Sequence, residues 1–179
     1  LLNYFKAIAG SIHIAVMIQD NPRSTGITMP MEFLLKAYHE IENFNYIKVE
    51  CPIPVRKMRK LIEMTDGKLK CYSGNGGIFA MDAYGAGAWG IMPGVVTAGR
   101  FVQMHKLFME GQVEAARDIF ENLLPLVWYE DQSLEFYISC EKELLRHEEI
   151  IKEGLVRLPG ETLSDTDKAE LYALYNRLR

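Results

Sequence analysis

Short apolar runs recur along the first ninety or so residues of the chain. Each is bounded by glycine, proline or small polar residues, which is typical of buried β-strands. The predicted strands are His13–Ile18, Tyr46–Val49, Leu69–Tyr72 and Ala88–Met92. Strand starts are spaced by roughly 20 to 33 residues, which leaves room for one helix between successive strands.

Between the strands the apolar residues recur every three or four positions. In Pro30–Ile41 they are Met31, Leu34, Leu35 and Tyr38, and Pro30 suits a first helical turn. Similar patterns predict further helices over Val55–Met64, Gly76–Tyr84 and about Val95–Met109. The first residues, Leu1–Ile12, read as the end of an amphipathic helix that is already in progress, as if the chain were the middle of a larger protein.

Alternating strands and helices predict right-handed βαβ units and a parallel sheet. Four such units make half of an eight-fold barrel, which needs about 250 residues in full. An open doubly wound sheet is the competing fold. Gly74-Asn75-Gly76-Gly77 argues against it, because it lacks the spacing of a dinucleotide-binding loop and no acidic residue follows about 20 positions later.

The last third of the chain carries no strand pattern. Val113–Tyr129 and Leu134–Ile151 are predicted helices, and Ser164 begins a last one. Ser164 and the carboxylates that follow it are the residues that a helix N-terminus favours. We therefore predict two domains, a barrel-type α/β part over residues 1–111 and an all-helical extension over residues 112–179.

Composition fits a globular enzyme. Of 179 residues, 49% are hydrophobic and 25% charged, and the net charge of −4 gives no electrostatic case for nucleic acid or anionic membrane. The longest apolar runs fall far short of the roughly 20 residues that span a bilayer. We expect neither nucleic acid nor membrane as a partner.

Cysteines and histidines are scattered. The widely spaced Cys51, Cys71 and Cys140 indicate reduced thiols, and hence a reducing, cytoplasmic location. The histidines are also far apart in the sequence, so we expect no metal site. They are His13, His39, His105 and His147.

Reactive side chains of parallel barrels gather where strands end. The four ends present Gln19 and Asp20, then Lys48, then Ser73-Gly74-Asn75, then Met92 and Gly94. Only Lys48 is a competent nucleophile. An amine at the mouth of a buried strand can attack a ketone and, after loss of water, form an iminium that withdraws electrons from the neighbouring carbon.

Five short motifs, in order along the whole chain, resemble one known family, the class I Schiff-base lyases grouped with dihydrodipicolinate synthase and N-acetylneuraminate lyase. They are Asn21-Pro22-x-x-Thr25-Gly26, Ile47-Lys48-x-Glu50, Ser73-Gly74-x-Gly76, Gly87-Ala88-x-Gly90 and Arg157-Leu158-Pro159. No single motif is specific for the family, but the order and spacing of all five together are specific.

The resemblance implies the C-terminal half of a (β/α)8 TIM barrel followed by C-terminal helices, with the N-terminal half absent from this chain but required for function. It also implies an imine between Lys48 and a small 2-keto acid, no cofactor, and a homo-oligomer, tetramer or dimer. We accordingly interpret Lys48, Gln19 and Asp20 as catalytic. The expected substrate-binding residues are Ser24, Thr25, Ser73, Gly74, Asn75, Met92 and Gly94.

Two positions depart from the family pattern. Gln19 stands where the family usually has a tyrosine, and Ser24 where the synthase branch has an arginine. Glutamine cannot transfer a proton as a phenol does, but it can orient a water or a hydroxyl. We therefore expect cleavage or dehydration of a 2-keto-3-deoxy acid. The alternatives are a true dihydrodipicolinate synthase, which condenses pyruvate with aspartate semialdehyde, and a non-catalytic relative that binds a keto acid.

Two acidic residues near these positions have competing interpretations. Asp20 is either a general acid/base or, slightly favoured, a cap for the turn at Pro22. Glu50, two residues past Lys48, is expected on the same side of the strand. A salt bridge there would oppose activation of the lysine, so we interpret Glu50 as structural or as a hydrogen-bond acceptor.

Overall fold

The computed structural model describes residues 1–178, and the chain separates into two compact units. The first comprises Leu1–Gly74 and Phe79–Met92, and the second Asn75–Ile78 and the described residues from Pro93 onward. This division groups the helix after the fourth strand with the C-terminal helices. The domain boundary predicted between residues 111 and 112 follows the repeat of strand and helix instead, and it stays a prediction.

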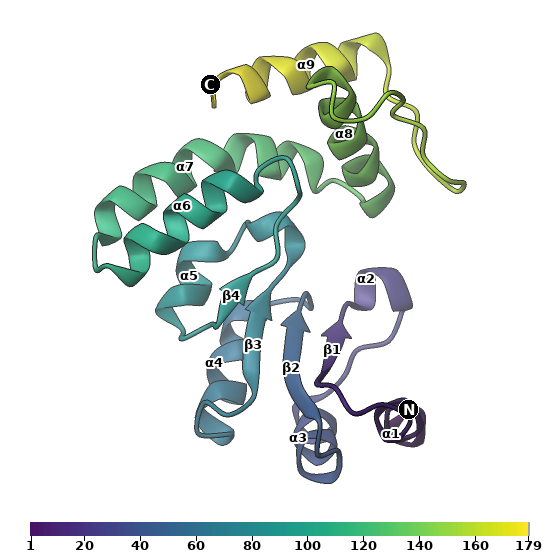
Figure 1. Ribbon diagram of the computed structural model, residues 1–179, viewed down its shortest axis with the longest axis vertical. Helices are drawn as coiled ribbons and strands as arrows, with labels where there is room; N and C mark the ends of the chain where they lie inside the picture. Colours follow the sequence, from purple (N-terminus) through teal and green to yellow (C-terminus); the bar gives the residue numbers. More distant parts are fainter. Residues whose placement is uncertain (179) are drawn as a thin grey trace. The chain divides into compact units, whose positions relative to one another are not determined.

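The first unit is built on a four-stranded parallel sheet in the order β1-β2-β3-β4 (Figure 1). The strands are β1 (Val16–Asp20), β2 (Phe44–Val49), β3 (Lys70–Ser73) and β4 (Gly90–Ile91). Sequential neighbours in a parallel sheet with helical crossovers are what the repeat predicts for part of a TIM barrel, and the α/β prediction is confirmed.

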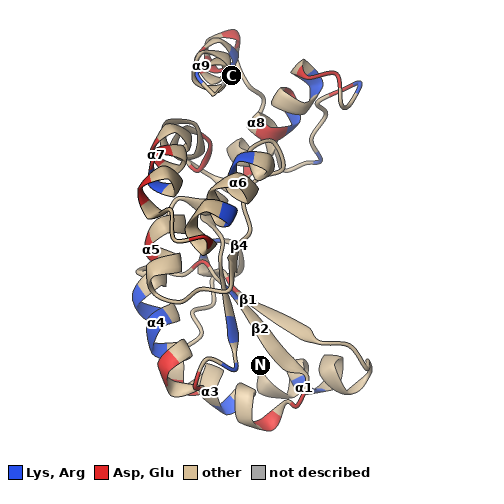
Figure 2. Cartoon of the chain, turned by 60° about the vertical axis from the view of Figure 1, so that its left-hand side comes forward, with Lys and Arg blue, Asp and Glu red and all other residues tan. Residues whose placement is uncertain are grey.

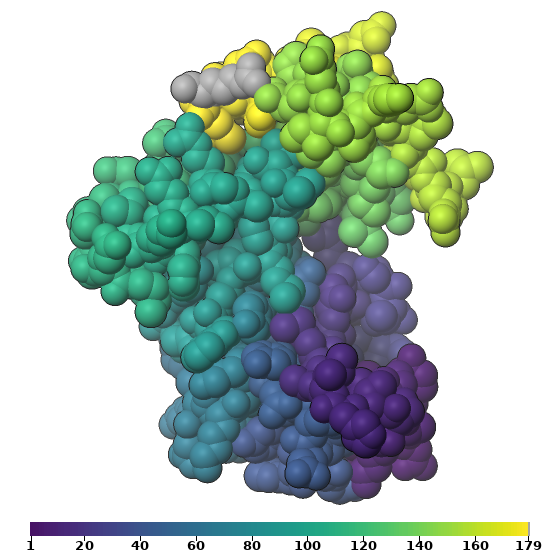
Figure 3. Space-filling model, viewed as in Figure 1, coloured from purple at the N-terminus to yellow at the C-terminus, as the bar shows by residue number. Residues whose placement is uncertain are grey.

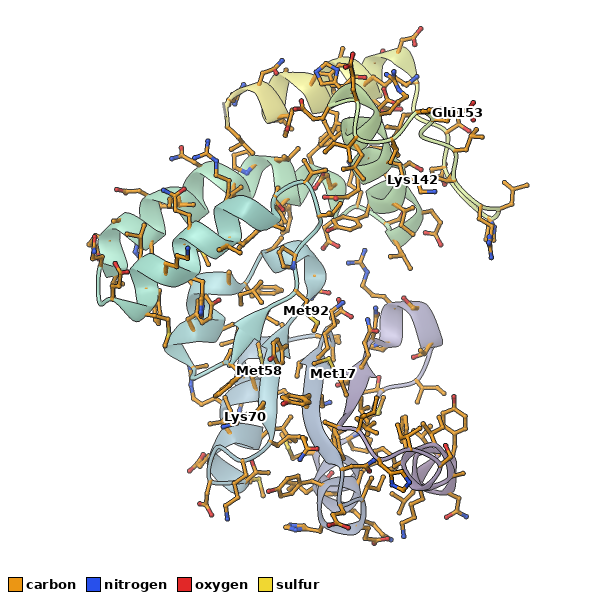
Figure 4. All side chains as sticks on the ribbon, in the orientation of Figure 1. Met17, Met58, Lys70, Met92, Lys142 and Glu153 are labelled. Atoms are coloured by element: carbon orange, nitrogen blue, oxygen red, sulfur yellow. The ribbon has the colours of Figure 1, made fainter. Side chains whose placement is uncertain are left out.

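Except for the one-turn helix after the first strand, the helices of the first unit pack against one face of that sheet, and side chains from both layers form a single apolar core. Ile18, Ile47 and Cys71 from the strands meet Leu34 and Met58 from the helices, all nearly inaccessible to solvent. Figure 4 labels Met58 on its helix. The helices of this unit are α1 (Leu2–Gly10), α2 (Pro22–Thr25), α3 (Met31–Glu40), α4 (Pro54–Met64) and α5 (Ala80–Gly85).

The helix α4 shows how the sequence produces the layer. Pro54 occupies its first turn, where the missing N–H costs no hydrogen bond. Met58 and Leu61 lie on its buried face, whereas Arg56, Arg59 and Lys60 are exposed. Figure 2 shows the basic side of this helix in blue.

Strand alternation gives the sheet two chemically different faces. Ile18, Ile47 and Val49 face the helices. Their neighbours in the strands face the other side, which we call the Lys48 face and define by two rows of side chains in register across the strands. The rows are Met17, Tyr46 and Lys70, and then Gln19, Lys48, Tyr72 and Gly90. Figure 4 labels Met17 and Lys70 on β1 and β3.

Strand boundaries differ from the predicted ones at both edges of the sheet. β1 begins at Val16 and continues through Asp20, which pairs in register with Val49 of β2 and whose buried carboxylate has a lysine partner in the core. The predicted start at His13 was wrong, since residues 13–15 are exposed. β4 is short, Gly90–Ile91, although Trp89 and Met92 also donate backbone hydrogen bonds to β3 at 2.8 Å.

The second unit is helical. After a single turn, η1 (Asn75–Gly77), its helices are α6 (Ala98–Met109), α7 (Val113–Glu130), α8 (Leu134–His147) and α9 (Asp165–Asn176). In Figure 3 the atoms of these residues run from teal through green to yellow. The helical prediction for the last third is confirmed. Ser164 forms the predicted cap, since its side chain accepts from Asp167 N and the Asp167 carboxylate accepts from Ser164 N.

Three of the described glutamates are buried inside this helical unit, and two of them lack the ion pair that the third, Glu143, makes with Arg146 at 2.6 Å. Glu130 in α7 is 1% exposed, and Glu141 in α8 is 7% exposed. Glu141 accepts from the backbone of Val96 at 3.0 Å, but Oε1 of Glu130 and Oε1 of Glu141 have no partner among the described residues. Burial, with the Glu141 charge adding to it, raises the pKa of Glu130 well above its usual value.

Among the described residues, no helix has the length and apolar character needed to span a bilayer.

We predict that Glu130→Gln stabilises the full-length protein at neutral pH. A buried carboxyl whose pKa is raised favours the folded state only while it is protonated, so stability falls as pH rises above the unfolded pKa near 4.3 toward the folded value. The amide removes that loss. Calorimetry should show a melting temperature higher by roughly 2 °C or more at pH 8, with the gain shrinking toward pH 4.5.

The matched control is Glu114→Gln on the same helix α7, because the Glu114 side chain is 87% exposed. Its melting temperature should follow the wild type at every pH. A Glu130→Gln protein with no pH-dependent gain would contradict the burial of a protonated acid.

Candidate active site on the Lys48 face of the sheet

Lys48 lies near the C-terminal end of the central strand β2, with Gln19 of β1 and Tyr72 of β3 as its neighbours in register. Its side chain is 22% exposed. Strand alternation therefore places the amine on the Lys48 face, flanked on both sides by polar side chains. This is the strand-end position that the sequence predicts for a nucleophile.

Glu50 is the carboxylate that holds the lysine. Its Oε1 lies 3.1 Å from Lys48 Nζ, and its side chain is only 7% exposed. Its Oε2 accepts a hydrogen bond from Gln19 Nε2 and another from Asn21 Nδ2 at 3.2 Å. The two carboxylate oxygens thus have separate partners, one the amine and the other two amides.

Gly74 makes the room that this carboxylate occupies. A Cβ built at position 74 would sit 2.2 Å from Glu50 Oε1 and 2.4 Å from its carboxyl carbon. Any side chain here would have to expel Glu50. Gly90 acts similarly one strand further, because its missing Cβ leaves space for the Tyr72 ring, 2.9 Å from the built atom.

The segment after β1 is ordered by Asn21. Its side chain accepts from Ser24 N and caps the one-turn helix α2, while its amide nitrogen reaches Glu50. Thr25 donates its hydroxyl to Asn21 O at 2.9 Å. Ser24, Thr25 and the neighbouring Arg23 are all exposed. Their predicted contact with a substrate stays a prediction.

Asp20 points away from Lys48. It lies on the helix side of the sheet, is completely buried and pairs with Lys57 Nζ at 2.6 Å; Met29 N donates to it at 3.4 Å. The interpretation of Asp20 as the cap of the Pro22 turn was wrong, because Asn21 supplies that cap. Its geometry also argues against direct proton transfer to a substrate on the Lys48 face.

The other predicted binding residues are dispersed. Ser73 is 1% exposed on the helix side of β3, and its hydroxyl has no partner among the described residues. Met92, labelled in Figure 4, follows β4 and donates its backbone N–H to Ser73 O. Asn75 and Gly94 belong to the helical unit. Substrate contacts of all four residues remain predictions.

Two residues near Lys48 were not expected to act with it. Glu50 was predicted on the same side as Lys48 and interpreted as structural or as a hydrogen-bond acceptor; it does accept from Gln19 and Asn21, and it also pairs with Lys48. Tyr72 was not singled out; its ring leans over Gly90, and burial raises the pKa of its phenol. Nothing in the sequence showed that Gln19 and Asn21 would converge on Glu50.

The arrangement suits carbonyl chemistry. An amine can add to a ketone, and an adjacent carboxylate can carry the protons that addition and dehydration require. Among residues 1–178, no three histidine, cysteine, aspartate or glutamate side chains cluster as metal ligands would. The predicted lack of a cofactor stays a prediction.

Residues 1–177 match the model of the Dihydrodipicolinate synthetase family. The chain is 28% identical over 179 residues to L-2-keto-3-deoxyarabonate dehydratase from Azospirillum brasilense, covering 99% of this chain and 57% of that protein. It is 29% identical over 129 residues to 4-hydroxy-tetrahydrodipicolinate synthase from Oceanobacillus iheyensis, covering 71% of this chain and 43% of that one.

Among solved structures, dihydrodipicolinate synthase from Rhodopseudomonas palustris superposes with a TM-score of 0.89 at 27% identity. The likeness covers 98% of this chain and 60% of that one. The chain thus spans about half the length of the curated relatives it matches, which agrees with the predicted half barrel.

We predict that Gly74→Ala destabilises the protein, because the new methyl group must displace Glu50 or shift β3. Overpacking of this kind costs about 1 to 3 kcal/mol, which should lower the melting temperature of the full-length protein by several degrees. Gly85→Ala is the matched control, since nothing lies within 4 Å of a Cβ built there. Equal melting temperatures for the two variants would contradict the close fit of Glu50 against Gly74.

Proposed function

The chain belongs to the Dihydrodipicolinate synthetase family, and on that premise we propose that it forms part of a class I 2-keto-acid lyase. In this proposal Lys48 captures the keto group of the substrate as an imine. The observation that carries the proposal is the place of Lys48 near the end of the central strand, 3.1 Å from a buried carboxylate that can exchange protons with it.

Chemically, the neutral amine of Lys48 adds to the keto carbon, and the carbinolamine then loses water to give an iminium. The positive nitrogen withdraws electrons from the adjacent carbon, so that an enamine can form there. If the enamine loses a β-hydroxyl, the reaction is a dehydration. If the enamine instead forms because the next C–C bond breaks, the reaction is an aldol cleavage. No metal or organic cofactor is needed, because the iminium itself is the electron sink.

The proposal also includes the N-terminal half of the barrel and the assembly of the whole protein. The first half of the barrel should supply the remaining wall of the site and close the sheet against β1 and β4, since an open sheet leaves unpaired edges. We further propose a cytoplasmic homo-oligomer, a tetramer or dimer.

A 2-keto-3-deoxy acid is the substrate class that the local residues favour. Ser24 offers a hydroxyl where a guanidinium would bind a second carboxylate bidentately. Gln19 has an amide that can both donate and accept, which suits the hydroxyls of a sugar acid. The likeness to a protein named as a 2-keto-3-deoxyarabonate dehydratase supports the same class.

One observation favours a different function. Lys48 is held in an ion pair with Glu50, an arrangement that a protein which only binds a keto acid could also keep. Such a protein would hold the keto acid without forming a covalent adduct. Imine trapping distinguishes the two functions.

We predict that borohydride reduction in the presence of pyruvate adds one pyruvate-derived group to the full-length protein, mapped to Lys48 by mass spectrometry. Lys48→Ala should give no adduct and no turnover, and its fold is checked by circular dichroism because loss of the amine leaves the buried Glu50 carboxylate without its cationic partner. Lys68→Ala, an exposed lysine before β3, is the control and should label as the wild type. Absence of an adduct on Lys48 would refute the lyase.

For substrate choice we predict a higher kcat/KM for 2-keto-3-deoxy acids than for condensation of pyruvate with aspartate semialdehyde. Each charge-assisted contact missing at Ser24 is worth roughly 1.5 to 3 kcal/mol, or about ten- to a hundred-fold in specificity. Ser24→Arg should shift the ratio toward the semialdehyde. A clear preference of the unaltered protein for the semialdehyde would refute this substrate class.

A further inference from the structure

We propose that Glu50 is the proton-transferring catalytic residue of this site, shuttling the proton between the lysine-bound substrate and the leaving group. The inference rests on the proposed function, because it assigns a role within the imine chemistry of Lys48. It changes the interpretation of Glu50 from a structural partner of the lysine to a reactive group.

Position is the first support. Glu50 Oε1 lies 3.1 Å from Lys48 Nζ. Once that nitrogen carries the substrate, the iminium carbon is one bond away and the carbon that loses its proton is one bond further. A base beside the nitrogen is therefore close to the carbon acid, which is the geometric requirement for general base catalysis.

Orientation is the second support. Gln19 and Asn21 both donate to Oε2 and so leave Oε1 directed at Lys48. Gly74 lacks the methyl group that would push Oε1 aside. Two amides at the end of β1 and one glycine after β3 thus fix a single carboxylate oxygen, and fixed orientation is what a reactive group needs.

Other described candidates near Lys48 fit the role less well. Asp20 faces the opposite side of the sheet and pairs with Lys57. The Tyr72 ring lies over Gly90 on the side of β4, away from β1. Gln19, which stands at the position of the family's usual tyrosine, has no titratable proton.

Dehydration needs one group that first accepts a proton and later returns it. The Glu50 carboxylate takes a proton from the carbon next to the iminium, and that C–H electron pair forms the enamine. The enamine then expels the β-hydroxyl as its C–O bond breaks, and the protonated Glu50 returns its proton to the departing hydroxide to give water. For aldol cleavage Glu50 takes the proton of the β-hydroxyl instead, the C–C bond breaks, and the same proton goes to the enamine carbon.

A purely electrostatic partner of Lys48 would behave in the opposite way. If Glu50 only kept the lysine protonated, its removal would favour the neutral amine and speed imine formation without slowing later steps. The two roles therefore predict opposite effects of replacing Glu50 on the rate, and one variant can distinguish them.

The experiment uses pyruvate as the probe and the full-length protein in deuterium oxide. Exchange of the pyruvate methyl protons is followed by NMR, and imine is quantified in parallel by borohydride trapping. We expect Glu50→Gln to form the imine but to exchange protons at least about 100-fold more slowly per imine than the wild type, which is the usual worth of a general base. Glu50→Asp should recover part of the exchange.

Glu63→Gln is the matched control, because Glu63 is exposed on α4, and it should exchange at the wild-type rate. Wild-type exchange per imine in Glu50→Gln would overturn the assignment, as would loss of imine itself in a normally folded variant. If Glu50→Gln does not fold, wild-type exchange per imine in Glu50→Asp overturns it and a deficit there upholds it. Failure of the lyase proposal is distinguishable, since the wild type would then trap no pyruvate.

Discussion

The ion pair between Lys48 and Glu50 is the interaction on which this site depends. Two opposite charges with little exposure stabilise each other only if their remaining hydrogen-bonding capacity is satisfied. The structure meets that condition with the amides of Gln19 and Asn21, and it meets the steric condition with Gly74. Features that look unrelated in the sequence are thus requirements of one carboxylate.

The same sheet carries one ion pair on each of its faces. Asp20, the residue after Gln19, forms a second ion pair with Lys57 on the helix side of the sheet. The backbone oxygen of Asp20 also accepts a hydrogen bond from the backbone N–H of Glu50 at 2.9 Å. The end of β1 is therefore tied to α4 by a buried charge and to the start of the Glu50 segment by its backbone. Such a rigid frame is what positions a catalytic carboxylate precisely.

Much of the fold follows from residue patterns, because the periods of strand and helix are local properties. The four strands, the helices between them and the Ser164 cap were all predictable in this way. Contacts between strands were not. The convergence of Gln19, Asn21 and Gly74 on Glu50 depends on the register of three parallel strands, which core packing sets, and a register shift of one residue would turn Gln19 to the other face. The role of Asp20 as the cap of the Pro22 turn was predicted wrongly for the same reason, since its partner Lys57 comes from a helix far along the chain.

Sequence could also not reveal the acids inside the helical unit. Glu130 and Glu141 occur in helical stretches that are otherwise ordinary, and only the packing of α7 and α8 shows that both are buried. Their burial concerns stability, whereas the carboxylate beside Lys48 also has an amine partner and two amide donors. Burial alone therefore does not identify a catalytic acid; its neighbours do.

The central claim is that Lys48 and Glu50 act together on one keto acid. The most direct measurement is a crystal structure of the full-length protein after borohydride reduction with pyruvate. We expect continuous electron density from Lys48 Nζ to the former keto carbon, with Glu50 Oε1 facing the carbon next to it and Oε2 still held by Gln19 and Asn21. An adduct on another lysine, or a Glu50 carboxylate turned away from the bound carbon, would contradict it.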